Sequence, residues 1–357
     1  MQYPTGNTGT LYTIPDSVTS IERNAFYSCR DLESVKLSDN LTSIESYAFA
    51  YCENLTEIKT DDNLRNNFKP SSTWGMFGGC KSLVNIPYVN LEYTTEMKYM
   101  FYNCRSVKKI ILPTLMEYVE TTESMFQDCY ELETIESYVG GKVAFGANWT
   151  NSVDNRWTNA QQMFYNCEKL TQLPFDSYAT SFASLQNVVG MFANCKSLTE
   201  INLYSKNNDG WSDLSLVASC FLRCENVRLL DLSPWSYSTQ NLTNLYNLFN
   251  GCRNLGSVSY SPLILNEWDL SNVENYDGMF GGCDNLWNID IYNASCATYN
   301  ILQDAYLASG LNYDPFINAP TCGGGNAQGS NRFILQATPY NMGYISYNNE
   351  YSTSFNE

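Results

Sequence analysis

The pentapeptide Met-Phe-Tyr-Asn-Cys occurs twice in the chain, at residues 100–104 and 163–167. A cysteine in a recurring motif is a candidate nucleophile, metal ligand or disulfide partner. The chain contains 13 cysteines and no histidine. Neither a Cys-His nor a Ser-His-Asp arrangement can therefore form, and zinc sites that use histidine are excluded.

The two pentapeptides belong to a longer repeat. Phenylalanine three residues before cysteine occurs ten times, always followed by Leu or Val three residues after the cysteine and by Ile, Leu or Val three residues later. Successive cysteines of this repeat lie 23 to 38 residues apart. A constant apolar motif with spacers of variable length is typical of a solenoid, in which each coil stacks on its neighbour. The core residues that this repeat predicts include Phe26, Cys29, Phe49, Cys52, Phe101, Cys104, Phe164, Cys167, Phe280 and Cys283.

Each repeat predicts one short strand and one short helical segment. The part of the motif after the cysteine is rich in β-branched residues, which favour strands. The part that ends in Met-Phe or Ala-Phe shows helical spacing in places, as at Met97, Met100 and Phe101, and predicts a short helix or 3-10 turn. One strand and one helical turn per coil predict an α/β solenoid of the leucine-rich repeat type with about ten coils.

The repeats also resemble known families. The stretch "IPDSVTSIERNAFYSCRDLESVKLSDNLTSIESYAFAYCENLTEI" resembles the BspA-like leucine-rich repeats of bacterial surface proteins. From residue 74 the coils are similar to the related Met-Phe-x-x-Cys repeat of mycoplasma and lactobacillus surface proteins, as in "WDLSNVENYDGMFGGCDNL" at 268–286. The resemblance covers roughly residues 12–292. It implies a leucine-rich repeat fold and a role in adhesion or recognition at a cell surface.

The chain divides into two predicted parts. Residues 1–295 form the solenoid, with a lead-in at 1–13, and residues 296–357 form a cap and an extension rich in Asn, Tyr and Gly. A solenoid needs a cap over its last coil, and 296–321 could provide it. The extension carries one predicted strand at 332–337, and the segment 332–357 could pair with another subunit.

The repeated cysteines predict structure rather than chemistry. One small, apolar thiol per coil suits the interior of the solenoid. Burial raises a thiol pKa, and a single column of thiols supplies at most two ligands where zinc needs four. Cys220 takes a position that methionine holds in most coils, so we expect it in the core; a Cys296–Cys322 disulfide is an alternative to two free thiols. We expect no catalytic residue, metal or cofactor.

Partner binding is expected on the concave face that the strands form. Residues on either side of the central apolar position of each strand should point outward, with lysines in the early coils and mainly carboxylates from Glu136 onward. A solvated face without a ligand is the alternative. The candidate binding residues are Lys36, Lys59, Lys109, Glu136, Glu200, Asp231 and Asp290. Aromatic side chains in flanking loops are further candidates, since they supply contact area at low entropic cost, although some of the tryptophans are expected in the core: Trp74, Tyr88, Trp211, Trp235 and Trp268.

Composition limits the classes of partner. The 357 residues carry a formal net charge of −17, which repels a phosphate backbone, so nucleic acid is not expected. No apolar run approaches the roughly 20 residues of a membrane helix, so no membrane insertion is expected. The first residues lack the features of a secretory signal.

We expect a non-catalytic recognition or adhesion module, not an enzyme, that binds a protein or glycan partner through the solenoid surface. Its expected location is extracellular or at a cell surface. The alternative is a structural or receptor-binding component of a phage particle, located in the virion, or of another surface assembly.

Overall fold

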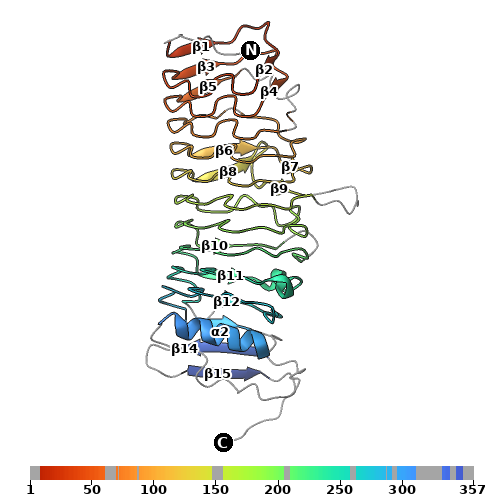
Figure 1. The fold of residues 1–357 in the computed structure, drawn as a ribbon, viewed down its shortest axis with the longest axis vertical. Helices are drawn as coiled ribbons and strands as arrows, with labels where there is room; N and C mark the ends of the chain where they lie inside the picture. The colour runs from red at the N-terminus through yellow and green to blue at the C-terminus, as the bar shows by residue number, and fades with distance from the viewer. Residues whose placement is uncertain are drawn as a thin grey trace, which may run out of the picture.

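Stacked coils form an elongated column in the computed structural model (Figure 1). The N-terminal coils lie at one end of the column, and α2, β14 and β15 lie at the other. The structure describes residues 9–60, 70, 72–86, 88–146, 156–204, 210–257, 263–286, 288–291, 296–310, 332–337 and 343–348.

Short parallel strands run across successive coils. Leu11, Ser34 and Glu57 are in register in three neighbouring coils, which matches the spacing of 23 residues in this part of the sequence. The strands of this first row are β1 (Leu11–Thr13), β3 (Ser34–Lys36), β5 (Glu57–Lys59), β6 (Lys109–Leu112), β8 (Thr134–Ser137), β10 (Glu200–Ile201), β11 (Leu229–Asp231), β12 (Leu263–Ile264) and β13 (Asn288–Asp290). Elsewhere in the coils β2 (Ser20–Ile21) pairs with β4 (Ser43–Ile44), and β7 (Leu115–Met116) pairs with β9 (Ala144–Phe145). The predicted leucine-rich repeat solenoid is confirmed.

The first row of strands is interrupted twice, between β5 and β6 and between β8 and β10. Each interruption falls in a coil whose sequence has proline in the strand position, Pro87 or Pro174, of which Pro87 lies outside the described residues. Proline has no N–H group to donate to a strand ladder. In the first of these coils, Asn85 still forms an isolated parallel bridge with Glu57.

Tight turns occupy the segment before each cysteine, where a short helix or 3-10 turn was expected. The residues two before and two after every repeated phenylalanine have positive φ angles, as at Asn24 and Ser28 around Phe26. The backbone N–H groups alternate in direction: Ala25 donates to Glu22 within the coil, and Phe26 donates to Ala48 of the next coil. Because every second N–H group bonds to the neighbouring coil, a continuous helical ladder cannot form.

Aromatic rings fill the centre of the column. The ten repeated phenylalanines stack in one ladder, with neighbouring ring centroids 4.8 to 5.9 Å apart. Tyr12 packs at the N-terminal end of this ladder and Tyr306 at the C-terminal end. Trp211, Trp235 and Trp268 form a second, fully buried ladder. These three tryptophans belong to the core, where some of the tryptophans were expected, so they are not candidates for contact with a partner.

The α-helix α2 (Cys296–Ala308) covers the last coil. Its Leu302, Ala305 and Tyr306 are buried in the main core, and the Tyr306 hydroxyl donates to the carbonyl of Leu286 at 3.1 Å. The Thr298 hydroxyl donates to the Trp268 carbonyl at 2.9 Å. Among the described residues before α2, two 3-10 helices occur, η2 (Ser233–Trp235) and η3 (Thr239–Asn241).

A β-hairpin continues the sheet beyond the last coil. The predicted strand at 332–337 is present as β14 (Arg332–Ala337), which pairs antiparallel with β13 and with β15 (Gly343–Asn348). Both edges of β14 are therefore hydrogen-bonded within the chain, and pairing of the segment 332–357 with another subunit stays a prediction. Residues 338–342 and 349–357 of the expected pairing segment, and Cys322, lie outside the described residues, as does the side chain of Cys296.

Candidate functional site

The repeated thiols are part of the core. Except for half-buried Cys29, every repeated cysteine is buried, and its Sγ donates to the carbonyl of the repeated phenylalanine in the preceding coil at 2.9 to 3.2 Å. All eleven described cysteines are free. Burial raises the pKa of Cys80 to about 12, and it also raises the pKa of Cys104 and Cys167. Protonated thiols aimed at core carbonyls are poor nucleophiles.

We call the outward side of the first row of strands the strand face. Lys36, Lys59, Lys109, Glu136, Glu200 and Asp231 are half-buried or exposed there. Asp290 is an exception with 1% exposure, so its expected outward position was wrong. It lies in β13, which is not the last strand of the sheet, because its far edge pairs with β14.

Charges on the strand face pair locally. Lys59 Nζ lies 2.7 Å from Glu57, and Lys109 Nζ lies 2.8 Å from Glu136. The hydrogen bond from Lys59 lowers the pKa of the Glu57 carboxyl group. The lysines of the early coils are therefore partly neutralised by neighbouring carboxylates, and the expected basic end of the face is weaker than the sequence suggested.

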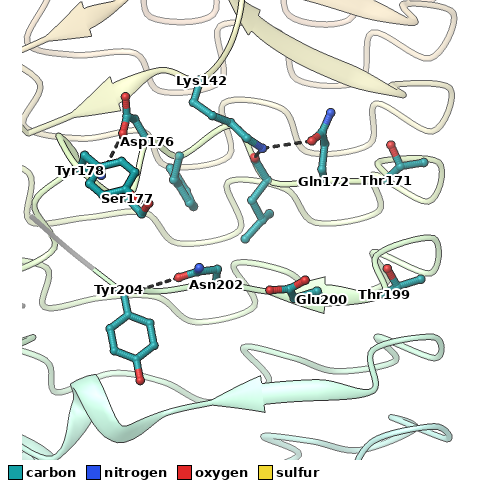
Figure 2. A pocket seen from close by; sticks show the side chains of 12 residues that line it. Lys142, Thr171, Gln172, Asp176, Ser177, Tyr178, Thr199, Glu200, Asn202 and Tyr204 are labelled. Atoms are coloured by element: carbon teal, nitrogen blue, oxygen red, sulfur yellow. Dashed lines mark hydrogen bonds between the residues drawn. The ribbon is translucent and has the colours of Figure 1, made fainter. Parts of the chain in front are cut away.

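A hollow of about 530 Å³ opens on the strand face at the second interruption of the sheet. Figure 2 shows the side chains that surround it, which come from three consecutive coils. Glu200 is the one residue of the expected binding set that lines it. The hollow is lined by Lys142, Thr171, Gln172, Leu173, Phe175, Asp176, Ser177, Tyr178, Thr199, Glu200, Asn202 and Tyr204.

Lys142 is held across the hollow by the next coil. Its Nζ donates to the carbonyl of Leu173 and, at 3.3 Å, to Oε1 of Gln172 (Figure 2). Partial burial lowers the pKa of the Lys142 ammonium group. Glu200 forms no salt bridge with any residue that the structure describes. Its exposed carboxylate therefore remains available to an incoming hydrogen-bond donor.

Two tyrosines flank the same opening. Tyr178 is 88% exposed, and its position is fixed by a hydrogen bond of 2.9 Å from its backbone N–H to Oδ1 of Asp176. The hydroxyl of Tyr204 donates to Asp231 of the following coil. Burial, together with this hydrogen bond, raises the pKa of Tyr204 to about 12. Asp231 thus holds the Tyr204 side chain beside the hollow, although Asp231 does not line the hollow itself.

Sequence reasoning missed most of this site. Lys142, Asp176 and Tyr178 lie outside the strand positions, so the repeat template gave them no role. One usable signal was Pro174, which follows the central apolar residue Leu173 and so falls at an outward position of the repeat, but which is buried. A proline in the strand position marks the coil where the ladder breaks and the surface can be indented.

Exposed carboxylate, amide, hydroxyl and ammonium groups beside two aromatic rings can hydrogen-bond to a polar ligand and stack on its apolar faces. No group of three or more histidine, cysteine, aspartate or glutamate side chains in the described part of the chain is arranged to hold a metal ion. No helix among the described residues is long and apolar enough to span a bilayer. Two aromatic candidates remain, and both are half-buried. The Tyr88 ring packs on the Tyr138 ring with 4.9 Å between the ring centroids, and the Trp74 ring lies beside the Tyr47 ring with 5.9 Å between the centroids.

Several solved structures are similar to this chain. A leucine-rich cell surface protein of Faecalibacterium prausnitzii A2-165 is 19% identical, with coverage of 84% of this chain and 91% of its own and a TM-score of 0.41. The leucine-rich repeat protein of T. pallidum is 24% identical, with coverage of 54% and 79% and a TM-score of 0.37. A leucine-rich repeat protein of Eubacterium ventriosum is 19% identical, with coverage of 76% and 82% and a TM-score of 0.33.

No curated protein sequence matches this chain. One family model matches in four overlapping segments, 46–156, 71–202, 116–235 and 215–301, which together span most of the solenoid. The chain therefore belongs to the family described as "Mycoplasma protein of unknown function, DUF285".

Proposed function

We propose that this protein is a non-catalytic recognition and adhesion module that binds a glycan displayed on a cell surface. The hollow on the strand face is the binding site. The observation that carries the proposal is the combination of exposed Tyr178 with the polar groups of Gln172, Glu200 and Asn202 around one opening.

The chemistry of a sugar suits this lining. A sugar ring has hydroxyl groups on its rim, which carboxylate and amide groups can engage in pairs of hydrogen bonds. Its C–H faces are apolar and can pack on a tyrosine ring. A volume of about 530 Å³ lies within the usual range of ligand pockets. An extracellular or cell-surface location follows from this proposal.

The proposal is tested by screening the full chain on a glycan array and titrating the best glycan by calorimetry. Glu200→Gln removes a charged acceptor, and Tyr178→Ala removes the exposed ring. Each should weaken binding by about tenfold, since a hydrogen bond to a charged group or a buried aromatic contact contributes about 1.5 kcal/mol. Glu225→Gln and Tyr246→Ala are matched controls that do not line the hollow, and they should leave the affinity unchanged.

Three outcomes would contradict the proposal. No glycan binds, or the control variants weaken binding as much as the site variants, or the protein cleaves the bound glycan. A protein ligand that binds wild type but not Glu200→Gln would replace the glycan as the partner of the same site.

A further inference from the structure

The column of repeated thiols ends in a cysteine that differs from the others. From Cys52 onward, each repeated thiol donates to the phenylalanine carbonyl of the repeat before it. Cys29 belongs to the first repeat, so no earlier phenylalanine carbonyl among the described residues can accept its proton. It is half-buried, whereas Cys52 in the next coil is fully buried. A thiol that solvent can reach therefore lies beside one that solvent cannot reach.

Cys29 and Cys52 occupy equivalent positions in neighbouring coils and are in contact. Next to Cys29, the N–H group of Ser28 donates to the Ala50 carbonyl of the second coil at 2.8 Å. Hydrogen-bonded neighbours of this kind lie about 4.8 Å apart, and a disulfide spans about 4.4 to 6.8 Å between Cα atoms. The two side chains also share a hydrogen bond. The backbone thus places the two sulfur atoms where a bond between them can form.

The shared hydrogen bond gives the two thiols different reactivities. It lowers the pKa of Cys29, against the opposing effects of partial burial and of the nearby Asp31 carboxylate. The same hydrogen bond, together with burial, raises the pKa of Cys52. The proton therefore stays on Cys52, and Cys29 ionises first. Redox-sensitive cysteines are typically accessible, readily ionised and adjacent to a second thiol, and Cys29 meets all three conditions.

We propose that Cys29 is a site of reversible oxidation by a hydroperoxide and that Cys52 closes a disulfide with it. The Cys29 thiolate attacks the OH oxygen of the hydroperoxide, the O–O bond breaks, and the departing alkoxide or hydroxide takes up a proton from water. The sulfur is oxidised by two electrons to a sulfenic acid, and the hydroperoxide is reduced. The Cys52 sulfur then attacks the Cys29 sulfur, the S–O bond breaks, and the oxygen leaves with the Cys52 proton as water.

Cys52 can carry out the second step inside the core. Its Sγ lies 2.9 Å from the Phe26 carbonyl oxygen and also contacts the Cys29 sulfur, so its single proton has two acceptors. Rotation about the Cβ–Sγ bond turns this proton from the carbonyl toward Cys29, where the leaving oxygen accepts it. A free Cys52 thiolate, which its raised pKa makes scarce at neutral pH, is therefore not needed.

The disulfide ties the first coil to the second. Terminal repeats of a solenoid have a neighbour on one side and open more readily than inner repeats. A bond from Cys29 to Cys52 opposes this opening because it joins the two coils covalently. We expect amide hydrogen exchange of residues 22–29 to become slower when the bond forms, and an unchanged rate would contradict this consequence.

The chain contains a matched control pair. Cys224 likewise shares a hydrogen bond with Cys252, the repeated thiol of the next coil, but both of these cysteines are buried. Burial also raises the pKa of Cys224. The control pair has the contact between thiols but lacks the accessible thiolate, so a hydroperoxide should not oxidise it in the folded protein.

The test treats the reduced full chain with hydrogen peroxide at neutral pH and then unfolds it in N-ethylmaleimide, which blocks the remaining thiols. Peptide mass spectrometry should find a Cys29–Cys52 link that a reductant removes, formed at least about tenfold faster than any Cys224–Cys252 link. With dimedone present during oxidation, Cys52→Ser should lose the link and carry the label on Cys29. Cys224→Ser should leave the Cys29–Cys52 link unchanged. Circular dichroism shows whether each variant is folded, and the wild-type rates decide if Cys52→Ser is not.

Any of three results overturns the proposal. Cys29 is oxidised no faster than the control pair, or Cys29 becomes a sulfinic acid while Cys52 remains a free thiol, or Cys29 forms a link to a second chain instead of to Cys52. None of these cysteines lines the hollow on the strand face, so failure of the glycan proposal leaves this one unaffected.

Discussion

Replacing a repeated cysteine separates two roles of the thiol, as apolar filling and as a hydrogen-bond donor. Cys167 lies in the middle of the column, is fully buried, and donates from Sγ to the Phe126 carbonyl at 3.2 Å. Cys167→Ala deletes both roles. The lost apolar group costs about 0.8 kcal/mol, the remaining void adds to it, and the hydrogen bond contributes about 0.5 kcal/mol. We expect a loss of about 2 kcal/mol in the free energy of unfolding.

Cys167→Ser keeps a donor at the same place but removes apolar volume. The C–O bond is shorter than the C–S bond, so the hydroxyl reaches the Phe126 carbonyl through a longer and weaker hydrogen bond. We therefore expect a loss of about 1 kcal/mol, smaller than that of Cys167→Ala. A thiol that only filled space would show the opposite order, because a buried hydroxyl without a partner costs about 1 to 3 kcal/mol.

The measurement is urea unfolding of the full chain at neutral pH with a reductant, followed by far-UV circular dichroism. The same two substitutions at Cys195, whose Sγ donates to the Phe164 carbonyl at 3.2 Å, provide a repeat in the next coil. Equal slopes of the transitions allow the midpoints to be compared as stabilities. If serine costs more than alanine at both positions, the hydrogen-bond role of the repeated thiol is refuted.

Three further predictions concern pH, reactivity and strain. Nine described thiols have raised pKa values, so the thiols of the unfolded chain ionise first as pH rises above roughly 8.5. The free energy of unfolding should then fall by up to about 1.4 kcal/mol per pH unit for each thiol, which lowers the urea midpoint, and a flat profile contradicts this. Cys29 is half-buried, and a hydrogen bond from Cys52 lowers its pKa, so peptide mass spectrometry should find it alkylated before the other described thiols in the native protein. Ser219 has a φ of 57°, so Ser219→Gly should raise the free energy of unfolding by about 1 kcal/mol, and a lower urea midpoint would count against strain there.

The repeat in the sequence predicted the stack of coils, the buried columns of Phe and Cys and the strand that most coils contain, but not the two interruptions of the strand row. These features depend on local spacing, because a side chain that recurs at the same place in every coil must meet its copies in the neighbouring coils. The turns around Phe26 and its counterparts could also have been suspected. Glycine recurs there in several coils, as at Gly278 and Gly282, where φ is positive.

The sequence alone decided the architecture of this protein, since ten copies of one apolar motif can be buried together only by stacking. The tertiary structure decided where its surface can bind. Glu200, Tyr178 and Lys142 lie far apart in the chain and line one hollow only because three consecutive coils stack on one another. Asp290 looked equivalent to Asp231 in the repeat but is buried, and its strand β13 is followed in the sheet by β14 instead of by another coil. A repeat template describes what every coil shares, whereas a binding site arises where one coil differs from its neighbours.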